Sequence, residues 1–328
     1  MMKKNVLFSV LVMTMIMTPA FATTYYWTNT NANNDFSVLT NWNTAQDGSG
    51  SVAGDLAGDV LRINITGANY AKLSSTLSDT PADIQIGTLA GVTGELQISG
   101  GTHTFTNAFR VAISKDTAAG IVTMTDGTVN VPNSYTTFGD TGTSIFNMSG
   151  GTFNTDRITF GQAATSVSTL NMTGGTINLS KTDSTPAVTS GSLRMGLGNT
   201  NLYLSGSSVI NTERFWINEG GLITMSGNAV IHITGTTDEN PTFNFTEDAI
   251  ASMLGKIVFN GGSFVVAGDY ESLFDAAIGN GNIYTTTAGV SVDAQYFAGN
   301  DVTTLVLVPE PMTMAILGLG SLFLRRRR

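Results

Sequence analysis

A glycine-centred turn recurs along the middle of this chain, and no other sequence feature restricts the fold as much. Each copy is an alternating apolar strand followed by two turn residues and a small polar residue. Four clear copies span Glu95–Thr102, Ile121–Thr128, Ile145–Thr152 and Thr169–Thr176, and degenerate copies follow at Asn201–Ser208, Gly221–Asn228 and Ile257–Ser263. The second turn residue falls at positions 101, 127, 151, 175, 207 and 228, so the steps are 26, 24, 24, 32 and 21 residues. A period in this range indicates a stack of repeated structural units.

A second motif, an apolar strand that usually ends in glycine, lies between the turns. Its copies are Ile84–Gly87, Phe109–Ala112, Thr137–Gly139, Ile158–Gly161, Leu193–Gly196 and Phe215–Ile217. Each repeat therefore has a strand before the turn, a short strand after it and a third strand. Within one repeat, four apolar residues alternate with two outward asparagines, a pattern typical of strands with one buried face. The apolar residues are Leu170, Met172, Ile177 and Leu179, and the asparagines are Asn171 and Asn178.

Short strands with glycine turns and no sustained helical period predict an all-β fold, a right-handed parallel β-helix. Each repeat forms one coil, and coils stack about 4.8 Å apart, so residues 84–268 give about eight coils over roughly 37 Å. Glycine suits the corners because φ is positive there, and asparagine or threonine at equivalent positions can form side-chain ladders. A β-sandwich or propeller is the alternative, but the observed steps are short for blades of about 40 residues.

The flanks of the repeats are expected to cover the open ends of the solenoid, which would otherwise pair with other molecules. Residues 23–83 are predicted to be an N-terminal cap with the first strands, including the aromatic, asparagine-rich opening and a strand at Val60–Ile65. Residues 269–307 are predicted to be a C-terminal cap. Short helices are expected at Ala249–Leu254 and Tyr270–Ile278, and strands at Val290–Val292 and Val302–Val308.

Charge and cysteine content exclude some classes of function. Residues 23–308 hold nine basic and 23 acidic residues, a net charge of about −14, so this region is a poor candidate for binding nucleic acid or anionic polysaccharide by overall charge. The chain has no cysteine, which excludes a disulfide framework. No metal site and no cofactor site is predicted, because no zinc, calcium or phosphate-binding motif occurs.

The N-terminus has the three parts of a secretory signal peptide over residues 1–22. Lys3 and Lys4 form the positive region, Val6–Met17 is apolar, and Ala20 and Ala22 frame a cleavage site for signal peptidase. The mature chain is expected to begin at Thr23. A retained N-terminal anchor is the alternative, but the apolar run is short for a membrane span.

The C-terminal segment 308–328 also has three parts. Val308, Pro309, Glu310 and Pro311 form a break, because proline fixes φ and removes a backbone donor. The 13 apolar residues Met312–Leu324 reach about 20 Å as a helix, short of the ~30 Å hydrocarbon core, so membrane retention would be transient. Arg325, Arg326, Arg327 and Arg328 then favour a cytoplasmic C-terminus. An ordinary tail anchor is the alternative.

In order and spacing, this tripartite segment is similar to the PEP-CTERM signal of bacterial surface proteins. The resemblance implies cleavage near the Pro-Glu-Pro by an exosortase, with transient membrane association and then release to the cell surface or the exopolysaccharide layer. The body, with Trp27 and Trp42 ahead of the Ser-Gly-Gly-Thr coils, resembles autotransporter passengers and other bacterial surface β-helix proteins.

Parallel β-helices include polysaccharide lyases and hydrolases, so the histidines, aspartates and arginines are candidate catalytic residues. His103 and His232 are expected at outward or turn positions of distant coils, with His103 solvated. Asp126 stands at the first glycine position of its turn, where aspartate is tolerated, so its presence does not require a catalytic role. Asp140 and Asp156 lie 16 residues apart with nothing in the spacing to pair them. Arginines beside successive third strands are expected to form a surface stripe, either plain surface charge or a glycan contact: Arg110, Arg157, Arg194 and Arg214.

This thin set of acids and bases favours a protein that is not an enzyme. The sequence therefore predicts an exported cell-surface or extracellular-matrix protein with a structural or adhesive role, associated with exopolysaccharide. Signal peptidase and exosortase are the expected processing partners, and no nucleic acid is expected. The alternatives are a β-helix polysaccharide lyase or glycoside hydrolase and a carbohydrate-binding module.

Overall fold

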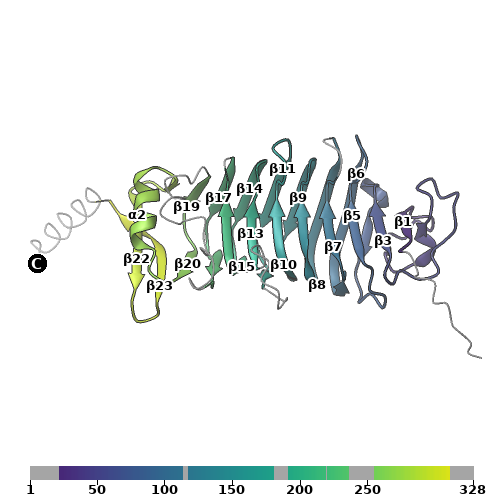
Figure 1. The fold of residues 1–328 in the computed structure, drawn as a ribbon, viewed down its shortest axis with the longest axis horizontal. Helices are drawn as coiled ribbons and strands as arrows, with labels where there is room; N and C mark the ends of the chain where they lie inside the picture. Colours follow the sequence, from purple (N-terminus) through teal and green to yellow (C-terminus); the bar gives the residue numbers. More distant parts are fainter. Residues whose placement is uncertain (1–21, 114–116, 181–190, 219, 236–254, 311–328) are drawn as a thin grey trace, which may run out of the picture.

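The computed structural model describes residues 22–113, 117–180, 191–218, 220–235 and 255–310. These residues wind into an all-β solenoid of about eight turns. Figure 1 shows the coils side by side along the long axis of the molecule. Neighbouring coils pair in parallel and in register, as where Asn171 faces Asn147 on one side and Tyr203 on the other. The β-solenoid predicted from the repeat is therefore confirmed.

Each coil passes through three parallel sheets, which we call the first, second and third. The first sheet holds the strands that precede the glycine turn. Its strands are β4 (Ala71–Leu73), the first parts of β6 (Thr93–Thr104) and β8 (Ala119–Phe138), β9 (Thr143–Met148), β11 (Val167–Met172), β14 (Asn199–Leu204), β17 (Gly221–Met225), β19 (Lys256–Phe259) and β21 (Ile283–Tyr284).

The second sheet follows the glycine turn and uses the later parts of β6 and β8. Its other parallel strands are the first half of β10 (Thr152–Phe160), β12 (Thr176–Leu179), β15 (Val209–Thr212), β18 (Val230–Ile233) and β20 (Ser263–Ala267). The third sheet uses the last residues of β8 and β10. Its other strands are β1 (Thr24–Trp27), β3 (Val60–Ile63), β5 (Asp83–Ile86), β7 (Ala108–Val111), β13 (Ser192–Met195) and β16 (Arg214–Ile217).

The corner between the first and second sheets depends on a left-handed residue. Gly151 and Gly175, the second glycines of their turns, have φ of +80° and +84°, as the turn pattern predicted. The copies at Asn201–Ser208 and Gly221–Asn228 differ, because Val209 rather than Ser208 pairs with Thr176, and Val230 pairs with Val209. Their turns are one residue longer, and the positive φ lies at Gly206 and Gly227, one residue before the positions aligned by sequence. That part of the sequence alignment is wrong by one residue.

The inward side chains of the three sheets meet in one continuous apolar core. Phe138 of the third sheet stacks on Phe146 of the first sheet and on Phe160 of the next coil, with ring centroids 4.9 and 5.1 Å apart. All three rings are fully buried, and burying one such side chain stabilises the fold by about 1.5–3 kcal/mol. Two buried hydroxyls of the first sheet are hydrogen-bonded: Ser168 Oγ accepts from Ser144 Oγ at 3.0 Å and donates to the Phe138 carbonyl at 2.7 Å. The core therefore holds without disulfides.

The N-terminal end is closed by three buried aromatic side chains, Trp27, Phe36 and Trp42. Trp42 meets the other two rings edge-on at 5.2 and 4.7 Å. Both indole nitrogens donate hydrogen bonds, Trp27 Nε1 to the Asn69 carbonyl and Trp42 Nε1 to the Phe36 carbonyl, each at 2.8 Å. The short elements of this end are β2 (Trp42–Asn43), antiparallel to β1, and the 3-10 helices η1 (Leu39–Asn41) and η2 (Gly67–Asn69).

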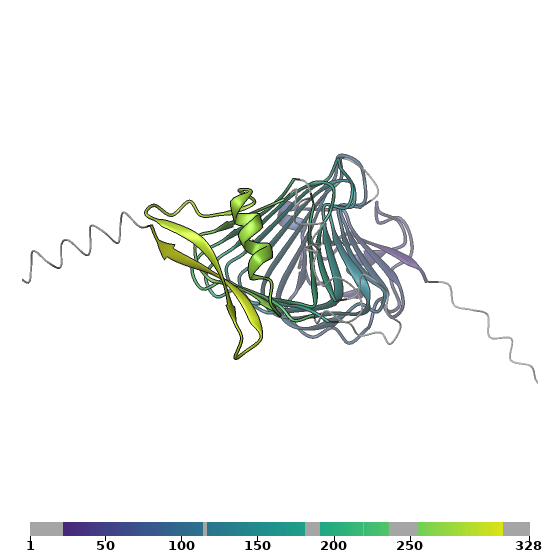
Figure 2. The same ribbon diagram turned by 60° about the vertical axis from the view of Figure 1, so that its left-hand side comes forward.

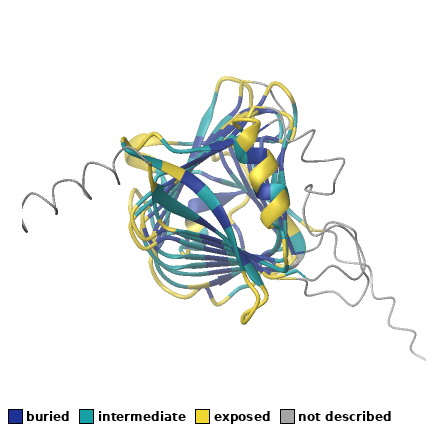
Figure 3. Cartoon of the chain, turned by 90° about the vertical axis from the view of Figure 1, so that its left-hand side faces the viewer, coloured by how far each residue is buried: buried dark blue, intermediate teal, exposed yellow. Residues whose placement is uncertain are grey.

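The C-terminal end is closed by one helix and a hairpin, α2 (Glu271–Gly279), β22 (Val290–Phe297) and β23 (Val302–Pro309). Strand β23 pairs antiparallel with both β20 and β22. Figures 2 and 3 show the helix and the hairpin at this end of the solenoid. The predicted helix at 270–278 and both predicted strands are confirmed, whereas the helix predicted at 249–254 lies outside the described residues.

Candidate functional site

The two aspartates considered as catalytic candidates, Asp140 and Asp156, do not lie together. Asp140 follows the third-sheet part of β8, and Asp156 directly precedes the third-sheet part of β10. They therefore lie beyond opposite ends of these four-residue strand segments, at least roughly 16 Å apart along the strand direction. Across the described ranges, no three histidine or acidic side chains lie close enough to hold a metal ion. Asp126 accepts a hydrogen bond from the Gly127 nitrogen at 2.7 Å, and the positive φ belongs to Gly127.

His103 is not the solvated turn residue that the sequence suggested. It pairs with Val129 in the inward column of the second sheet, and it is fully buried. Its Nε2 lies 2.8 Å from the Gly100 carbonyl, while Nδ1 has no hydrogen-bond partner. Burial lowers the pKa of His103 below its ordinary value, partly offset by the Gly100 carbonyl. His232 does lie outward, beside Asn211 on the second sheet.

The arginines gather on one surface. All five arginines between residues 22 and 310 lie on the outer face of the third sheet, interleaved with aromatic side chains. We call this surface the arginine–aromatic face. It consists of Tyr26, Arg62, Arg110, Tyr135, Arg157, Arg194, Arg214 and Trp216. The predicted stripe of four arginines is thus brought together, and the structure extends it by Arg62 and three aromatic residues.

Strand register places these side chains in two adjacent columns. The first column runs through Tyr26, Arg62, Gln85, Arg110, Thr137, Thr159, Arg194 and Trp216, one residue from each coil. The second column lies two residues earlier on each strand and holds Tyr135, Arg157 and Arg214. Thr137 and Thr159 are only 3% and 7% exposed although they point outward. Long side chains therefore cover the short ones and form the surface itself.

Four guanidinium groups of this face lie over aromatic rings. Arg62 lies 5.7 Å from the Tyr26 ring centroid, and Arg194 lies 5.7 Å from that of Trp216. Tyr135, which is 37% exposed, is flanked by two guanidinium groups at 5.8 and 5.4 Å, those of Arg110 and Arg157. Stacking of this kind contributes about 0.5–1 kcal/mol at exposed sites and fixes the plane of the guanidinium.

Hydrogen bonds and neighbouring charges also act on the guanidinium groups of this face. Arg110 forms an ion pair with Asp83 at 2.5 Å, and Arg62 donates to Gln85 Oε1 and to the Tyr26 hydroxyl at 3.0 and 3.1 Å. Burial lowers the pKa of Arg194 from its ordinary value, and the positive charge of Arg157 lowers it further. The guanidinium groups of Arg157 and Arg194, on neighbouring strands, therefore lie close enough to repel each other.

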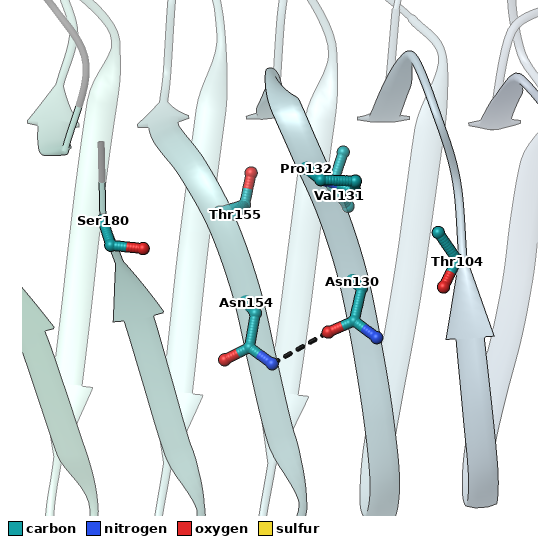
Figure 4. Close-up of a pocket in the computed structure, with 7 residues that line it drawn as sticks. All are labelled: Thr104, Asn130, Val131, Pro132, Asn154, Thr155 and Ser180. Carbon is teal, nitrogen blue, oxygen red and sulfur yellow. Dashed lines mark hydrogen bonds between the residues drawn. The ribbon is translucent and has the colours of Figure 1, made fainter. Parts of the chain in front are cut away.

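The outer face of the second sheet is built differently, from asparagines. The amide of Asn154 donates to Asn130, Asn178 donates to Asn154, and Asn211 donates to Asn178, each at 2.9 Å. This ladder confirms the side-chain stacking predicted for Asn178. A shallow groove of about 360 Å³ lies beside it, and Figure 4 shows Asn130, Asn154, Val131 and Pro132 on its wall. The groove has no charged residue in its lining.

Four residues of the arginine–aromatic face were missed by the sequence analysis: Arg62, Tyr26, Tyr135 and Trp216. Trp216 could have been found, because its motif copy Phe215–Ile217 aligns it with Arg194 of Leu193–Gly196. Tyr135 lies two residues before the motif copy that begins at Thr137, and Tyr26 had been assigned to the cap. These residues are brought into line by the register of the coils, and that register depends on the lengths of the intervening turns.

The processing segments lie mostly outside the described residues, including Ala20, Pro311, and Arg325 to Arg328. Ala22 is described and exposed, just before β1. Val308 and Pro309 form the end of β23, opposite Ser291 and Val290, so the strand ends at the predicted break. Glu310 is exposed, and its nitrogen donates to the Gly289 carbonyl at 3.0 Å. Within residues 22–310, as far as the structure describes them, no helix has the length and hydropathy required to cross a bilayer.

Comparison with known proteins adds no relative: no family model, no curated protein and no solved structure matches this chain.

Proposed function

We propose that this is an exported protein of the cell surface or extracellular matrix, with a structural or adhesive role and a contact to exopolysaccharide. Its processing partners are signal peptidase at Ala22 and an exosortase at the Pro-Glu-Pro. We include in the proposal a right-handed coil, on the general rule that crossovers between parallel strands are right-handed. The observation that carries the proposal is the arginine–aromatic face, because it gives a capped solenoid one outer surface chemically unlike the others.

The end of the hairpin supports processing at the proposed break. Strand β23 makes its last pair at Pro309, and Glu310 is exposed. Cleavage next to Glu310 would therefore leave every described strand in place. The apolar run that follows is short for a stable span, which suits retention that ends when the segment is removed.

Mass spectrometry of the surface fraction from cells that express the full chain tests this proposal. The expected surface form begins at or near Thr23 and lacks Arg325 to Arg328. A matched variant with Pro309→Ala and Pro311→Ala should keep the arginines and stay in the membrane fraction. Surface protein that retains the four arginines would contradict the sorting mechanism.

A carbohydrate-binding module is the second candidate, favoured by the same face. A polysaccharide lyase or hydrolase has no comparable support, because Asp140 and Asp156 lie at opposite strand ends. We expect the full chain to release no reducing ends or unsaturated products from a panel of plant and algal polysaccharides, with or without Ca²⁺. Turnover above about 1 per second, the usual enzyme range, would contradict this.

A further inference from the structure

The arginine–aromatic face is long and continuous rather than a compact site. Tyr26 in β1 and Trp216 in β16 are separated by seven coil steps, roughly 34 Å at about 4.8 Å per step. One coil step is close to the length of one sugar unit in an extended polysaccharide. A single small anion would contact one or two arginines. The arginine and aromatic side chains are instead spaced so that an extended chain along the solenoid axis could contact all of them.

The guanidinium groups are pre-organised for planar anions. Arg62 is held by Tyr26 and Gln85, and Arg194 lies over Trp216, so little rotamer entropy remains to be lost on binding. A guanidinium stacked through its face keeps its N–H groups at its edge, and carboxylates accept such groups in pairs. The parts of the aromatic rings that the guanidinium groups leave uncovered provide apolar surface for sugar C–H groups, and Tyr135 is 37% exposed.

The positive charge of the arginine–aromatic face favours an acidic ligand over a neutral one. The region 23–308 carries a net charge of about −14, yet its described arginines are all on this one face. A neutral glycan would be bound by aromatic residues and amides and would gain nothing from five guanidinium groups. Other faces repel polyanions, so an acidic chain is guided to this surface. Nucleic acid would use the same groups, but an exported protein meets acidic polysaccharide instead.

We propose that the arginine–aromatic face binds a carboxylated polysaccharide that runs along the solenoid axis. Arg62 and Arg194 bind carboxylates near its two ends, and Tyr135 and Trp216 contact the sugar rings between and beside them. Phosphate and free sugars are not ligands at comparable affinity, because each fills a fraction of the face. This inference rests on the proposed function for the location of the protein, outside the cell.

Binding of the full chain, in mild detergent, to polygalacturonate, dextran and a single-stranded oligonucleotide tests the proposal. The wild type should bind polygalacturonate, bind it less tightly as salt rises, and leave dextran unbound. Replacing both Arg62→Gln and Arg194→Gln should weaken binding by about tenfold or more, since each loses a charge-assisted pair. Trp216→Ala should weaken it by about fivefold.

Two variants on the first sheet serve as matched controls. The double variant Lys72→Gln and Lys256→Gln removes an equal charge, and Tyr203→Ala removes an aromatic ring that is 43% exposed. Both should bind within about twofold of wild type, because neither touches the arginine–aromatic face. Melting temperatures of all four proteins establish that each is folded.

Three results would overturn the proposal. The controls could lose as much affinity for polygalacturonate as the face variants, or the wild type could bind dextran as tightly as polygalacturonate. The wild type could also bind the oligonucleotide more tightly than polygalacturonate. Fractionation of cells that express the full chain separates this result from the proposed function. If the protein reaches the cell surface but does not bind polygalacturonate, the proposed function stands and the inference is refuted. Protein that binds polygalacturonate but stays inside the cell refutes the proposed function and leaves the binding face established.

Discussion

The outer faces of the second and third sheets come from the same coils, yet they use polar residues in opposite ways. On the second sheet, asparagine amides bond to one another from coil to coil at 2.9 Å. On the third sheet, arginines stack on aromatic rings at 5.4–5.8 Å from the ring centroids. The ladder directs its hydrogen bonds along the stack, whereas stacked guanidinium groups keep N–H donors for other partners.

The two faces of one repeat unit therefore have different roles: the asparagine ladder stabilises the stack, and the arginine–aromatic face binds the ligand. A ladder of amides stabilises the stack because each amide is both donor and acceptor. Replacing a ladder residue should therefore lower stability and leave binding alone. Replacing an arginine of the arginine–aromatic face should weaken binding and lower stability by less.

The largest expected effect comes from the corner that fixes the ladder in register. Gly175 has φ of +84°, and a Cβ there would lie 2.7 Å from the Met148 methyl group and 2.8 Å from the Gly150 carbonyl carbon. Gly175→Val should lower the free energy of unfolding by about 2–3 kcal/mol, because a β-branched residue is strained at this φ. Chemical denaturation measures the change. Gly54→Val is the control, since a Cβ at Gly54 meets nothing within 4 Å. Equal stability of the two variants would show that Gly175 does not constrain the corner.

The next effect compares the two faces directly. Asn178 donates to Asn154 and accepts from Asn211, so Asn178→Ala should cost about 1–2 kcal/mol of unfolding free energy. Arg194→Gln should cost about 0.5–1 kcal/mol, the value of its contact with Trp216. Denaturation curves give both numbers, and binding of polygalacturonate should change only for Arg194→Gln. A larger stability loss for Arg194→Gln would show that the arginine–aromatic face is itself structural.

A smaller effect concerns the inward side of the second sheet. Because burial lowers the pKa of His103 in the folded chain, the unfolded chain binds a proton first as the pH falls. The stability associated with neutral His103 is complete above its ordinary pKa near 6.5 and declines below that pH as the folded pKa is approached. His103→Leu should remove this decline, as melting curves from pH 7.5 to 5 would show. His232→Leu, on the outer face, is the control, and an unchanged slope in His103→Leu would place His103 in solvent.

Much of this architecture follows from the sequence. The Gly-Gly-Thr turns predict the coils, the positive φ at Gly151 and Gly175, and the asparagine ladder, because each is a local requirement of one turn or one strand. The inward position of His103 was also within reach, since the residue after Gly-Gly-Thr is inward in every clear copy, as at Phe153 and Ile177.

The arginine–aromatic face was only partly predictable. Arg110 and Arg194 share a motif position, but Tyr26 and Arg62 meet them through strands of the N-terminal region that no repeat marks. The extra residue in the turns at Ser205–Ser208 and Ser226–Ala229 also shifts register beyond what alignment on glycine gives. Contacts between coils depend on these lengths, so they require the structure.

Hydroxyl-radical footprinting of the full chain, with and without polygalacturonate, tests most directly whether the third sheet is the binding surface. Tyr135 and Trp216 on the third sheet and Tyr203 on the first sheet are the reporting side chains. The account predicts that the polysaccharide slows oxidation of Tyr135 and Trp216 and leaves Tyr203 unchanged. Protection of Tyr203 with full reactivity at Tyr135 and Trp216 would contradict it.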